Sequence, residues 1–297
     1  MDIVRTEAGP VVVGVDRSDC ARDAVVWAAD LAAAWGAPLH LVHVAPLEPS
    51  VSEAQPWLSG LLDIAERPGS APPRMHCVWG SVVDVLAEHA ADARVVVLGS
   101  YGEGAWAGML AGSVALGLVG RATCPVAIVR GSAPQVPPPH DGPVVVGVDG
   151  SGAGRAALRL AAGLAVSLRA PLVAVHTWTD VVAGPAGATR RTEGPEFLAA
   201  EAAALLDDEL GALAQSYPDL PVERVVAEDT PLRTLLDRAV GARVLVVGNR
   251  GHDRGSGMLS SSTSSALAEF ARCPVVVTGP VEVSDELSTV GTARAVR

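Results

Sequence analysis

Two stretches of the chain contain residues that could bind a phosphate. In each, an apolar and β-branched run, residues 95–98 or 244–247, leads directly into glycines, and a helical pattern follows. A buried strand that feeds a glycine-rich loop and then a helix leaves backbone N–H groups and the positive end of the helix open. These groups can receive a phosphate without a cationic side chain, so both loops are candidate phosphate sites.

The glycine spacing is well defined in the first stretch. Two residues separate Gly99 from Gly102, and nine separate Gly102 from Gly112-Ser113. Glycines after a strand also serve tight turns and close packing, and one such loop alone favours that structural role. A second copy at a fixed distance favours a shared function instead. Three pairs of residues stand 149 apart: Gly99 and Gly248, Gly102 and Gly251, and Cys124 and Cys273.

A second recurring feature places a carboxylate after the first strand of each half. That strand runs into Asp16 or, 133 residues later, into Asp149. Such a carboxylate can accept a hydrogen bond from an exocyclic amine or a ribose hydroxyl. The alternative is a structural Asx turn or helix N-cap with Ser18 or Ser151. Recurrence beside the glycine loop favours ligand binding.

The rest of the pattern alternates strands with helices. It predicts strands over residues 11–15, 39–44, 75–79 and 144–148, and helices over residues 21–35, 57–64, 82–91 and 196–215. Ser81 is expected to cap the helix that follows it. The offset between the halves grows from 133 to 149, so the second half holds 16 extra residues, placed within residues 179–220. This alternation predicts an α/β fold of doubly wound parallel sheets, with ligands beyond the carboxyl ends of the strands.

The repeat divides the 297-residue chain into two domains. We expect a first domain over residues 1–131, a stiff and extended Pro-rich linker over 132–142, a second domain over 143–280 and a flexible tail over 281–297. Hydrophobic residues make up 49% of the chain but aromatic residues only 3%. The cores must therefore be built from Val, Leu and Ala, which favours parallel strands covered by Ala-rich helices.

Charge and residue types exclude several functions. The net charge of −11 argues against a nucleic-acid or anionic-membrane partner, because either would repel most of the surface. All 22 basic residues are arginine, which excludes a P-loop lysine, a Schiff-base lysine and a kinase-type ATP lysine. No carboxylate pair has metal-ligand spacing. We therefore predict no metal site, no catalytic residue and no efficient enzyme, while slow ATP hydrolysis stays open.

Cysteines, histidines and the N-terminal sequence are interpreted as ordinary features of a cytoplasmic protein. The N-terminal MDIVRTEAGP has no apolar signal segment, and no run is suited to span a membrane. His43 and His176 are interpreted as core or crevice histidines with a satisfied hydrogen bond. The cysteines form no CxxC pair and are interpreted as reduced structural residues: Cys20, Cys77, Cys124 and Cys273.

Taken together, these motifs resemble the universal stress protein family, and the whole chain resembles its tandem two-domain, actinobacterial-type members. The resemblance covers residues 10–130 and 143–279. It rests on Val-Gly-Val-Asp-x-Ser in both first strands, on His43-Val44 and His176-Thr177, and on the glycine signature followed by Cys-Pro-Val. It implies two Rossmann-like domains of the adenine nucleotide alpha hydrolase-like type.

The resemblance also implies a ligand and its contacts. In the ATP-binding branch of the family, the aspartate reads adenine, the residue after the histidine borders base and ribose, and the glycine loop with its Ser or Thr holds the phosphates. The expected cofactor is ATP, with or without Mg²⁺. In the first half the expected binding residues are Gly14, Val15, Asp16, Ser18, Val44, Leu98, Gly99, Tyr101, Gly102, Gly112, Ser113 and Val114. In the second half they are Gly147, Val148, Asp149, Ser151, Thr177, Val247, Gly248, Arg250, Gly251, Ser261, Ser262 and Thr263.

The two implied sites are expected to be unequal. If the third glycine position needs a positive φ, its replacement by Ser261 costs on the order of 1 kcal/mol, about a fivefold loss of affinity. Arg250 and Arg254 could offset this cost through the phosphates, but we expect the first site to bind more tightly. Three positions depart from the family pattern: Arg17 after Asp16, Ser261 in place of the third glycine, and Asp229 in place of Gly80.

We expect a cytoplasmic stress-response protein that binds ATP in one or both halves and works as a nucleotide-dependent regulator. Two alternatives stay open: a nucleotide-free dimerising scaffold, and an adenylating or nucleotidyl-transfer enzyme. Such an enzyme typically needs a Ser-Gly-Gly loop or a His-x-Gly-His element, and neither occurs. The apolar runs at residues 126–129 and 275–277 are expected to be edge strands that pair with each other or with a second chain, giving a homodimer.

Overall fold

The computed structural model describes residues 9–45, 55–102, 112–133, 135–179, 181–184, 187–190, 194–249 and 260–279. The side chains of residues 55, 181–190 and 260–262 are not included in this description. The expected tail over residues 281–297 lies outside it, and so do Arg250, Arg254 and Gly251.

Each half alternates strands and helices as the sequence pattern predicts. The first half consists of β1 (Val11–Val15), α1 (Asp19–Trp35), β2 (Leu39–Ala45), α2 (Gln55–Ala65), β3 (Arg74–Trp79), α3 (Val82–Ala90), β4 (Val95–Gly99), α4 (Ser113–Val119) and β5 (Val126–Val129). The second consists of β6 (Val144–Gly147), α5 (Gly152–Leu168), β7 (Leu172–Trp178), β8 (Val181–Gly184), β9 (Gly187–Arg190), α6 (Pro195–Ser216), β10 (Val222–Glu228), α7 (Pro231–Ala239), β11 (Val244–Val247), α8 (Ser260–Phe270) and β12 (Val275–Val277).

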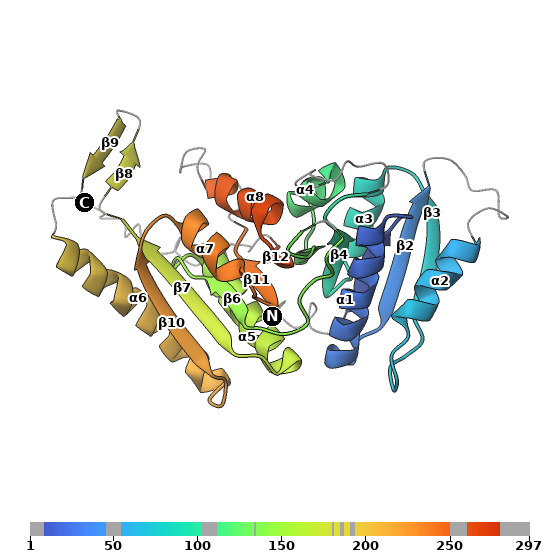
Figure 1. Ribbon diagram of the computed structural model, residues 1–297, viewed down its shortest axis with the longest axis horizontal. Helices are drawn as coiled ribbons and strands as arrows, with labels where there is room; N and C mark the ends of the chain where they lie inside the picture. The colour runs from blue at the N-terminus through green and yellow to red at the C-terminus, as the bar shows by residue number, and fades with distance from the viewer. Residues whose placement is uncertain are drawn as a thin grey trace, which may run out of the picture.

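The strands of both halves form one ten-stranded sheet in the order β10-β7-β6-β11-β12-β5-β4-β1-β2-β3 (Figure 1). Within each half, all neighbouring strands of this sheet pair in parallel. Val11, for example, lies opposite Leu39 and Val95. The doubly wound α/β fold predicted from the sequence is confirmed. In both halves, strands are added first on one side of the first strand and then on the other. The loops after β1 and β4 therefore open at neighbouring strand ends, and so do the loops after β6 and β11.

The two halves join where β12 meets β5 in an antiparallel pair, at Val275 opposite Ile128 and Val277 opposite Val126. The prediction that these two strands pair with each other is confirmed. We call this pair the seam. Because the seam uses both strands, the outer edges of the sheet are β3 and β10.

Helices cover both faces of the sheet, and successive side chains of each strand point to opposite faces. Val11 and Val13 face a core shared with α1, α2, α5 and α6, whereas Val12 faces the core under α3 and α4. The first of these cores is continuous across both halves. Small residues such as Ala24 and Ala28 are fully buried on α1, which agrees with the expectation of Ala-rich helices packed closely on the sheet.

The extra residues of the second half lie within residues 179–220, as expected. They form the separate hairpin β8–β9, which stands clear of the sheet in Figure 1, as well as the longer helix α6. Two other expectations from the sequence need correction. The linker is not extended throughout, because Val136 N donates to Ala133 O and Gln135 has a φ of 68°. Ser81 occupies the N-cap position of α3, but its side chain makes no capping hydrogen bond.

The cysteines are all free, as expected, but they differ in surroundings. Cys20, Cys124 and Cys273 are buried, and burial raises the pKa of both Cys124 and Cys273 to about 12. Cys77 is exposed on the edge strand β3, so its interpretation as a structural residue is wrong. Among the described residues, no helix combines the length and apolar character that a membrane crossing requires.

Candidate functional site

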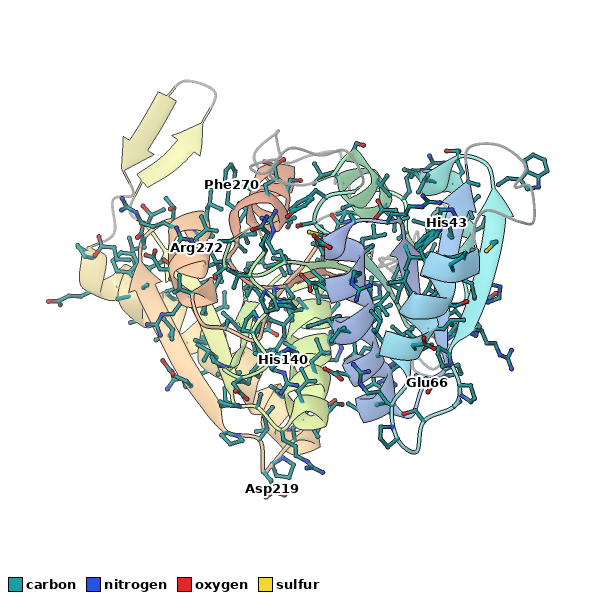
Figure 2. All side chains as sticks on the ribbon, turned by 45° about the vertical axis from the view of Figure 1, so that its right-hand side comes forward. His43, Glu66, His140, Asp219, Phe270 and Arg272 are labelled. Carbon is teal, nitrogen blue, oxygen red and sulfur yellow. The ribbon has the colours of Figure 1, made fainter. Side chains whose placement is uncertain are left out.

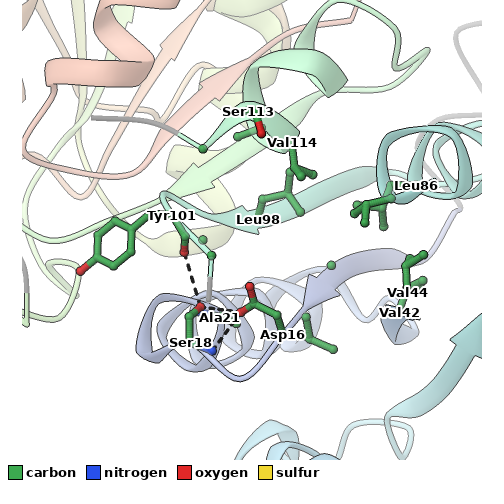
Figure 3. Close-up of a pocket in the computed structure, with 17 residues that line it drawn as sticks. Asp16, Ser18, Ala21, Val42, Val44, Leu86, Leu98, Tyr101, Ser113 and Val114 are labelled. Atoms are coloured by element: carbon green, nitrogen blue, oxygen red, sulfur yellow. Dashed lines mark hydrogen bonds between the residues drawn. The ribbon is translucent and has the colours of Figure 1, made fainter. Parts of the chain in front are cut away.

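A cavity of about 450 Å³ opens at the carboxyl ends of β1, β2 and β4 (Figure 3). It collects all twelve first-half residues that the resemblance implies, although they come from separate strands and loops. The residues that line it are Gly14, Val15, Asp16, Ser18, Ala21, Val42, Val44, Val82, Leu86, Leu98, Gly99, Tyr101, Gly102, Gly112, Ser113, Val114 and Ala115.

Asp16 is held in a fixed orientation at one side of this cavity. Its Oδ1 accepts hydrogen bonds from Ser18 N at 3.0 Å and from Ser18 Oγ at 2.5 Å. Ser18 Oγ in turn accepts from Ala21 N at 3.1 Å, which caps α1. The structural Asx turn and N-cap are therefore present, and they also fix the carboxylate at the cavity (Figure 3). The structural and binding roles of Asp16 are compatible.

Another part of the cavity wall is apolar. Val42 and Val44 come from β2, and Val82 and Leu86 come from α3. The sequence analysis missed Val42, Val82 and Leu86, together with Ala21 and Ala115. Two signals could have found the first three: Val42 lies two residues before Val44 on the same strand face, and Val82 and Leu86 lie four apart on one helix face.

The glycines of the loop serve different purposes. A Cβ on Gly99 would lie 2.7 Å from the backbone carbon of Cys20, so Gly99 is required for packing β4 against α1. Of the described residues, a Cβ on Gly102 would meet only Asp16, with Oδ2 at 2.7 Å, so this glycine keeps the space beside the carboxylate open. Gly112 has a φ of −69° and ordinary surroundings for a Cβ. The condition of a positive φ, on which the expected cost of Ser261 depends, is therefore not met at Gly112.

Ser113 and Tyr101 take positions that the sequence did not determine. Ser113 is the exposed first residue of α4, and Gly112 is the N-cap, so Ser113 does not occupy the N-cap position of this helix. Tyr101 lines the cavity with its backbone near Ser18, whose Oγ lies 3.4 Å from the Tyr101 carbonyl oxygen. A hydrogen bond with Cys20 and partial burial raise the pKa of the Tyr101 phenol to about 12, so the phenol stays protonated at neutral pH.

His43 and Arg17 lie beside the cavity without lining it. His43 Nδ1 lies 3.0 Å from the Val15 carbonyl oxygen, which confirms the interpretation of a crevice histidine with a satisfied hydrogen bond. Figure 2 shows His43 near the upper end of β2. Its ring centroid lies 5.0 Å from that of Trp57. The exposed Arg17 places its guanidinium carbon 5.6 Å from the Trp57 ring centroid and therefore points toward α2.

A smaller cavity of about 240 Å³ occupies the equivalent place in the second half. His176 lines it and repeats the hydrogen bond of His43, with Nδ1 2.7 Å from Val148 O. Ser264 Oγ donates to Gly248 O at 2.9 Å. The described residues that line this cavity are Gly147, Val148, Asp149, Gly154, Val175, His176, Thr177, Pro231, Leu235, Val247, Gly248, Thr263 and Ser264.

The second cavity contains seven of the twelve implied residues of its half. Ser151 is not among them, although it repeats the bonds of Ser18: it caps α5 by accepting from Gly154 N at 3.0 Å and donates to Asp149 Oδ1 at 2.6 Å. Arg250 and Gly251 fall outside the described residues, and so do the side chains of Ser261 and Ser262. The sequence analysis missed Gly154, Val175, His176 as a lining residue, Pro231, Leu235 and Ser264.

The repeated cavity and the glycine loops match a known family. The sequence fits the Universal stress protein family over residues 8–130 and again over residues 142–279. The chain belongs to the universal stress protein family. Universal stress proteins Rv2623 and Rv2005c of Mycobacterium tuberculosis are each 35% identical to it over 288 residues. These alignments cover 90% of this chain and 95% and 96% of the two relatives.

Solved structures of universal stress proteins share the fold at lower sequence identity. The crystal structure of a universal stress protein from Archaeoglobus fulgidus superposes with a TM-score of 0.62 at 16% identity. It covers 93% of this chain and 98% of its own. The tandem resemblance and the α/β fold expected from the sequence are thus confirmed for this universal stress protein.

Proposed function

We propose that the first cavity binds ATP and that the protein acts as a nucleotide-dependent regulator in a stress response. One observation carries this proposal: all twelve first-half residues implied by the resemblance line a single cavity of about 450 Å³. Small-molecule sites typically enclose about 300–1,000 Å³, so a nucleotide is a suitable occupant.

The chemistry of the walls supports a mode of binding. Val42, Val44 and Leu86 offer apolar contacts for the faces of the adenine ring. Asp16, oriented by Ser18, can accept a hydrogen bond from the base or the ribose. The open space at Gly102 lets backbone N–H groups approach the phosphates, which takes the place of the absent lysine.

A magnesium ion would arrive with the phosphates. Mg²⁺ retains several waters and binds nucleotide phosphates with one or two protein oxygens. In the described part of the chain, no group of three His, Cys, Asp or Glu side chains is placed to hold a metal. The proposal therefore includes Mg²⁺ only as a companion of ATP.

The second cavity is a weaker candidate for the same ligand. Its volume of about 240 Å³ lies below the usual range for such ligands. Residues 250–259, after Asn249, lie outside the described chain. The comparison of the two cavity volumes therefore concerns only the part of the second cavity around Asp149 and Thr177. We propose ATP binding in the first half and weaker binding in the second.

We further propose that this regulator is a cytoplasmic homodimer without efficient catalysis. The seam occupies β5 and β12, so a second copy would pair along β3 or β10, or through a helical face. Sedimentation at micromolar concentration checks this part, and a monodisperse monomer would exclude the dimer.

Nucleotide release tests the binding proposal. Protein purified from its own cells is denatured, and the supernatant is analysed by anion-exchange chromatography. We expect an adenine nucleotide at about one equivalent per chain, and a loss of about 100-fold in ATP affinity for Gly102→Val, because its side chain would occupy the space beside Asp16. Gly60→Val on α2 is the matched control, since a Cβ there meets no atom of the described chain within 4 Å.

The outcomes separate the alternatives. No released nucleotide, together with no calorimetric heat on adding ATP, would favour the dimerising scaffold. Equal ATP affinity in Gly102→Val and Gly60→Val would show that the glycine loop serves only packing. Stoichiometric turnover of ATP into a transferred adenylate would favour the nucleotidyl-transfer enzyme.

A further inference from the structure

The helices that follow the two glycine loops each end on a residue of the opposite half. Val119, the last residue of α4, accepts a hydrogen bond at 3.0 Å from Asn249 Nδ2 of the second half. At the end of α8, the carbonyl oxygens of Glu269 and Ala271 accept from Arg130 Nη1 of the first half, the latter at 3.4 Å. We call these two contacts the cross-caps.

The cross-caps are not a simple product of the repeat, because they come from positions that are not equivalent. The residue 149 positions after Arg130 is Gly279, where a Cβ would lie 2.8 Å from Thr123 O, so no side chain fits. The residue 149 positions before Asn249 is Ser100, which is 1% exposed and lies 3.8 Å from Cys20 Sγ. Each half thus supplies one cross-cap by a different residue.

The chemistry suits the ends of helices. The last carbonyl groups of a helix have no partner within it and carry the negative end of the helix dipole. Arg130 offers a cation there, and burial lowers the pKa of its guanidinium without removing its charge. The helix ends also pack across the boundary, because Ala268 belongs to the first-half core and Val119 packs against the second-half core. Figure 2 shows Phe270 and Arg272 in this central region.

The opposite ends of the same helices border the two cavities. Ser113, at the start of α4, lines the first cavity, whereas Thr263 and Ser264 of α8 line the second. Asn249 directly follows Gly248, which lines the second cavity. Its backbone N–H donates to Thr278 Oγ1 at 3.2 Å beside the seam. Asn249 therefore joins the edge of the second cavity to the end of α4 by a side-chain hydrogen bond.

We infer that Asn249 and Arg130 are positioning residues through which each half holds the site helix of the other. Occupation of the second cavity then changes the stability of α4 at the first. The positioning requires only the cross-caps, while the ligand response rests on the proposed function.

Amide hydrogen exchange of the full chain tests the positioning without nucleotide. We expect about fivefold faster exchange in α4 for Asn249→Ala, which matches the loss of one hydrogen bond of about 1 kcal/mol. Arg130→Ala should have the same effect on α8 and spare α4, so the two variants control for each other. Asn249→Asp keeps the shape but removes the donor, and it serves if Asn249→Ala folds poorly. Unchanged exchange in the helix of the opposite half would overturn the inference.

The ligand response is tested with the first cavity blocked by Gly102→Val. Added ATP can then occupy only the second cavity. We expect it to slow amide exchange in α4 about twofold, and we expect no such slowing when the chain also carries Asn249→Ala. The coupling would be overturned if calorimetry shows ATP binding while the exchange rate of α4 stays the same. It would also be overturned if ATP still slows this exchange in the Asn249→Ala variant. If neither the parent nor any variant binds ATP, the proposed function fails. The exchange rates measured without nucleotide still test whether Asn249 and Arg130 hold α4 and α8.

Discussion

The first and second cavities share one frame but differ in their walls. At three equivalent positions, Val44, Val114 and Ala115 of the first cavity correspond to Thr177, Thr263 and Ser264 of the second. The first has about 450 Å³ of space and the second about 240 Å³. Thr177 and Thr263 carry a hydroxyl in place of a methyl group, and Ser264 carries an added hydroxyl, which weakens the contacts that an aromatic base would gain. The duplication has therefore kept the backbone arrangement while the chemistry of the two walls diverged.

The largest expected effect concerns the aspartate turn, which is tighter in the second half. A Cβ on Gly154 would lie 2.3 Å from Asp149 Oδ1, whereas the first half tolerates Ala21 at this place. We expect Gly154→Ala to lower the free energy of unfolding by about 1–3 kcal/mol, because the Asp149 turn must shift. Urea denaturation followed by circular dichroism measures the change.

Gly152→Ala is the matched control in the same turn of α5, since a Cβ there meets no atom within 4 Å. It should be neutral or stabilise by up to about 1 kcal/mol, as Ala replaces Gly in a helix. Equal effects of the two substitutions would show that the Asp149 turn is as adaptable as its first-half counterpart.

A second difference lies in three histidines at the outer edge of the first half. The ring centroids of His40 and His76 are 5.0 Å apart, and those of His76 and His89 are 5.7 Å apart. His76 Nε2 is buried and has no hydrogen-bond partner among the residues that the structure describes. Burial, followed by the neighbouring positive charges, lowers the pKa of both His40 and His76 below the ordinary value of 6.5. The second half has Val173, Val225 and Arg238 at the equivalent positions.

This cluster predicts that acid destabilises the first half. Between the lowered folded pKa and the unfolded value of 6.5, the unfolded chain binds more protons, so stability falls as the pH drops below 6.5. We expect a loss below about 1 kcal/mol, because both rings are partly exposed and solvent screens them. Melting temperatures across pH 5–7 measure it. The double substitution His40→Val and His76→Val should flatten this dependence, and an unchanged pH dependence would contradict the prediction.

The smallest expected effect concerns the third glycine position. Because Gly112 has a φ of −69°, Gly112→Ser should change the free energy of unfolding by less than about 0.5 kcal/mol. Any loss of ATP affinity, which we expect to be about fivefold or less, then reports contact with the ligand rather than backbone strain. Calorimetry on Gly112→Ser and on the reciprocal Ser261→Gly measures this. Tighter binding by the second half of the unmodified chain would contradict the expected ranking.

Much of the fold and of the first cavity could be predicted from the sequence, since strand runs, glycines and the repeat are local signals. Val42 and Leu86 were missed because apolar residues at strand or helix spacing usually indicate a buried core position. Only the sheet topology brings these two residues to the same cavity as Asp16. Whether Gly112 needs a positive φ could not be decided from the sequence, because glycine also occurs where no special φ is needed, as at an N-cap. The cross-caps could not be predicted, because Asn249 and Val119 are 130 residues apart and meet only across the seam.

The seam also changes how the protein responds to dilution. If the two halves were separate chains, the seam, the shared core and the cross-caps would have to outweigh the loss of translational freedom, and the pair would dissociate on dilution. Here the chain between β5 and β6 links the two partners and gives them a high effective molarity, on the order of millimolar for a short link. The paired arrangement of the two cavities is therefore kept at any expression level, even in a cell that holds only a few copies.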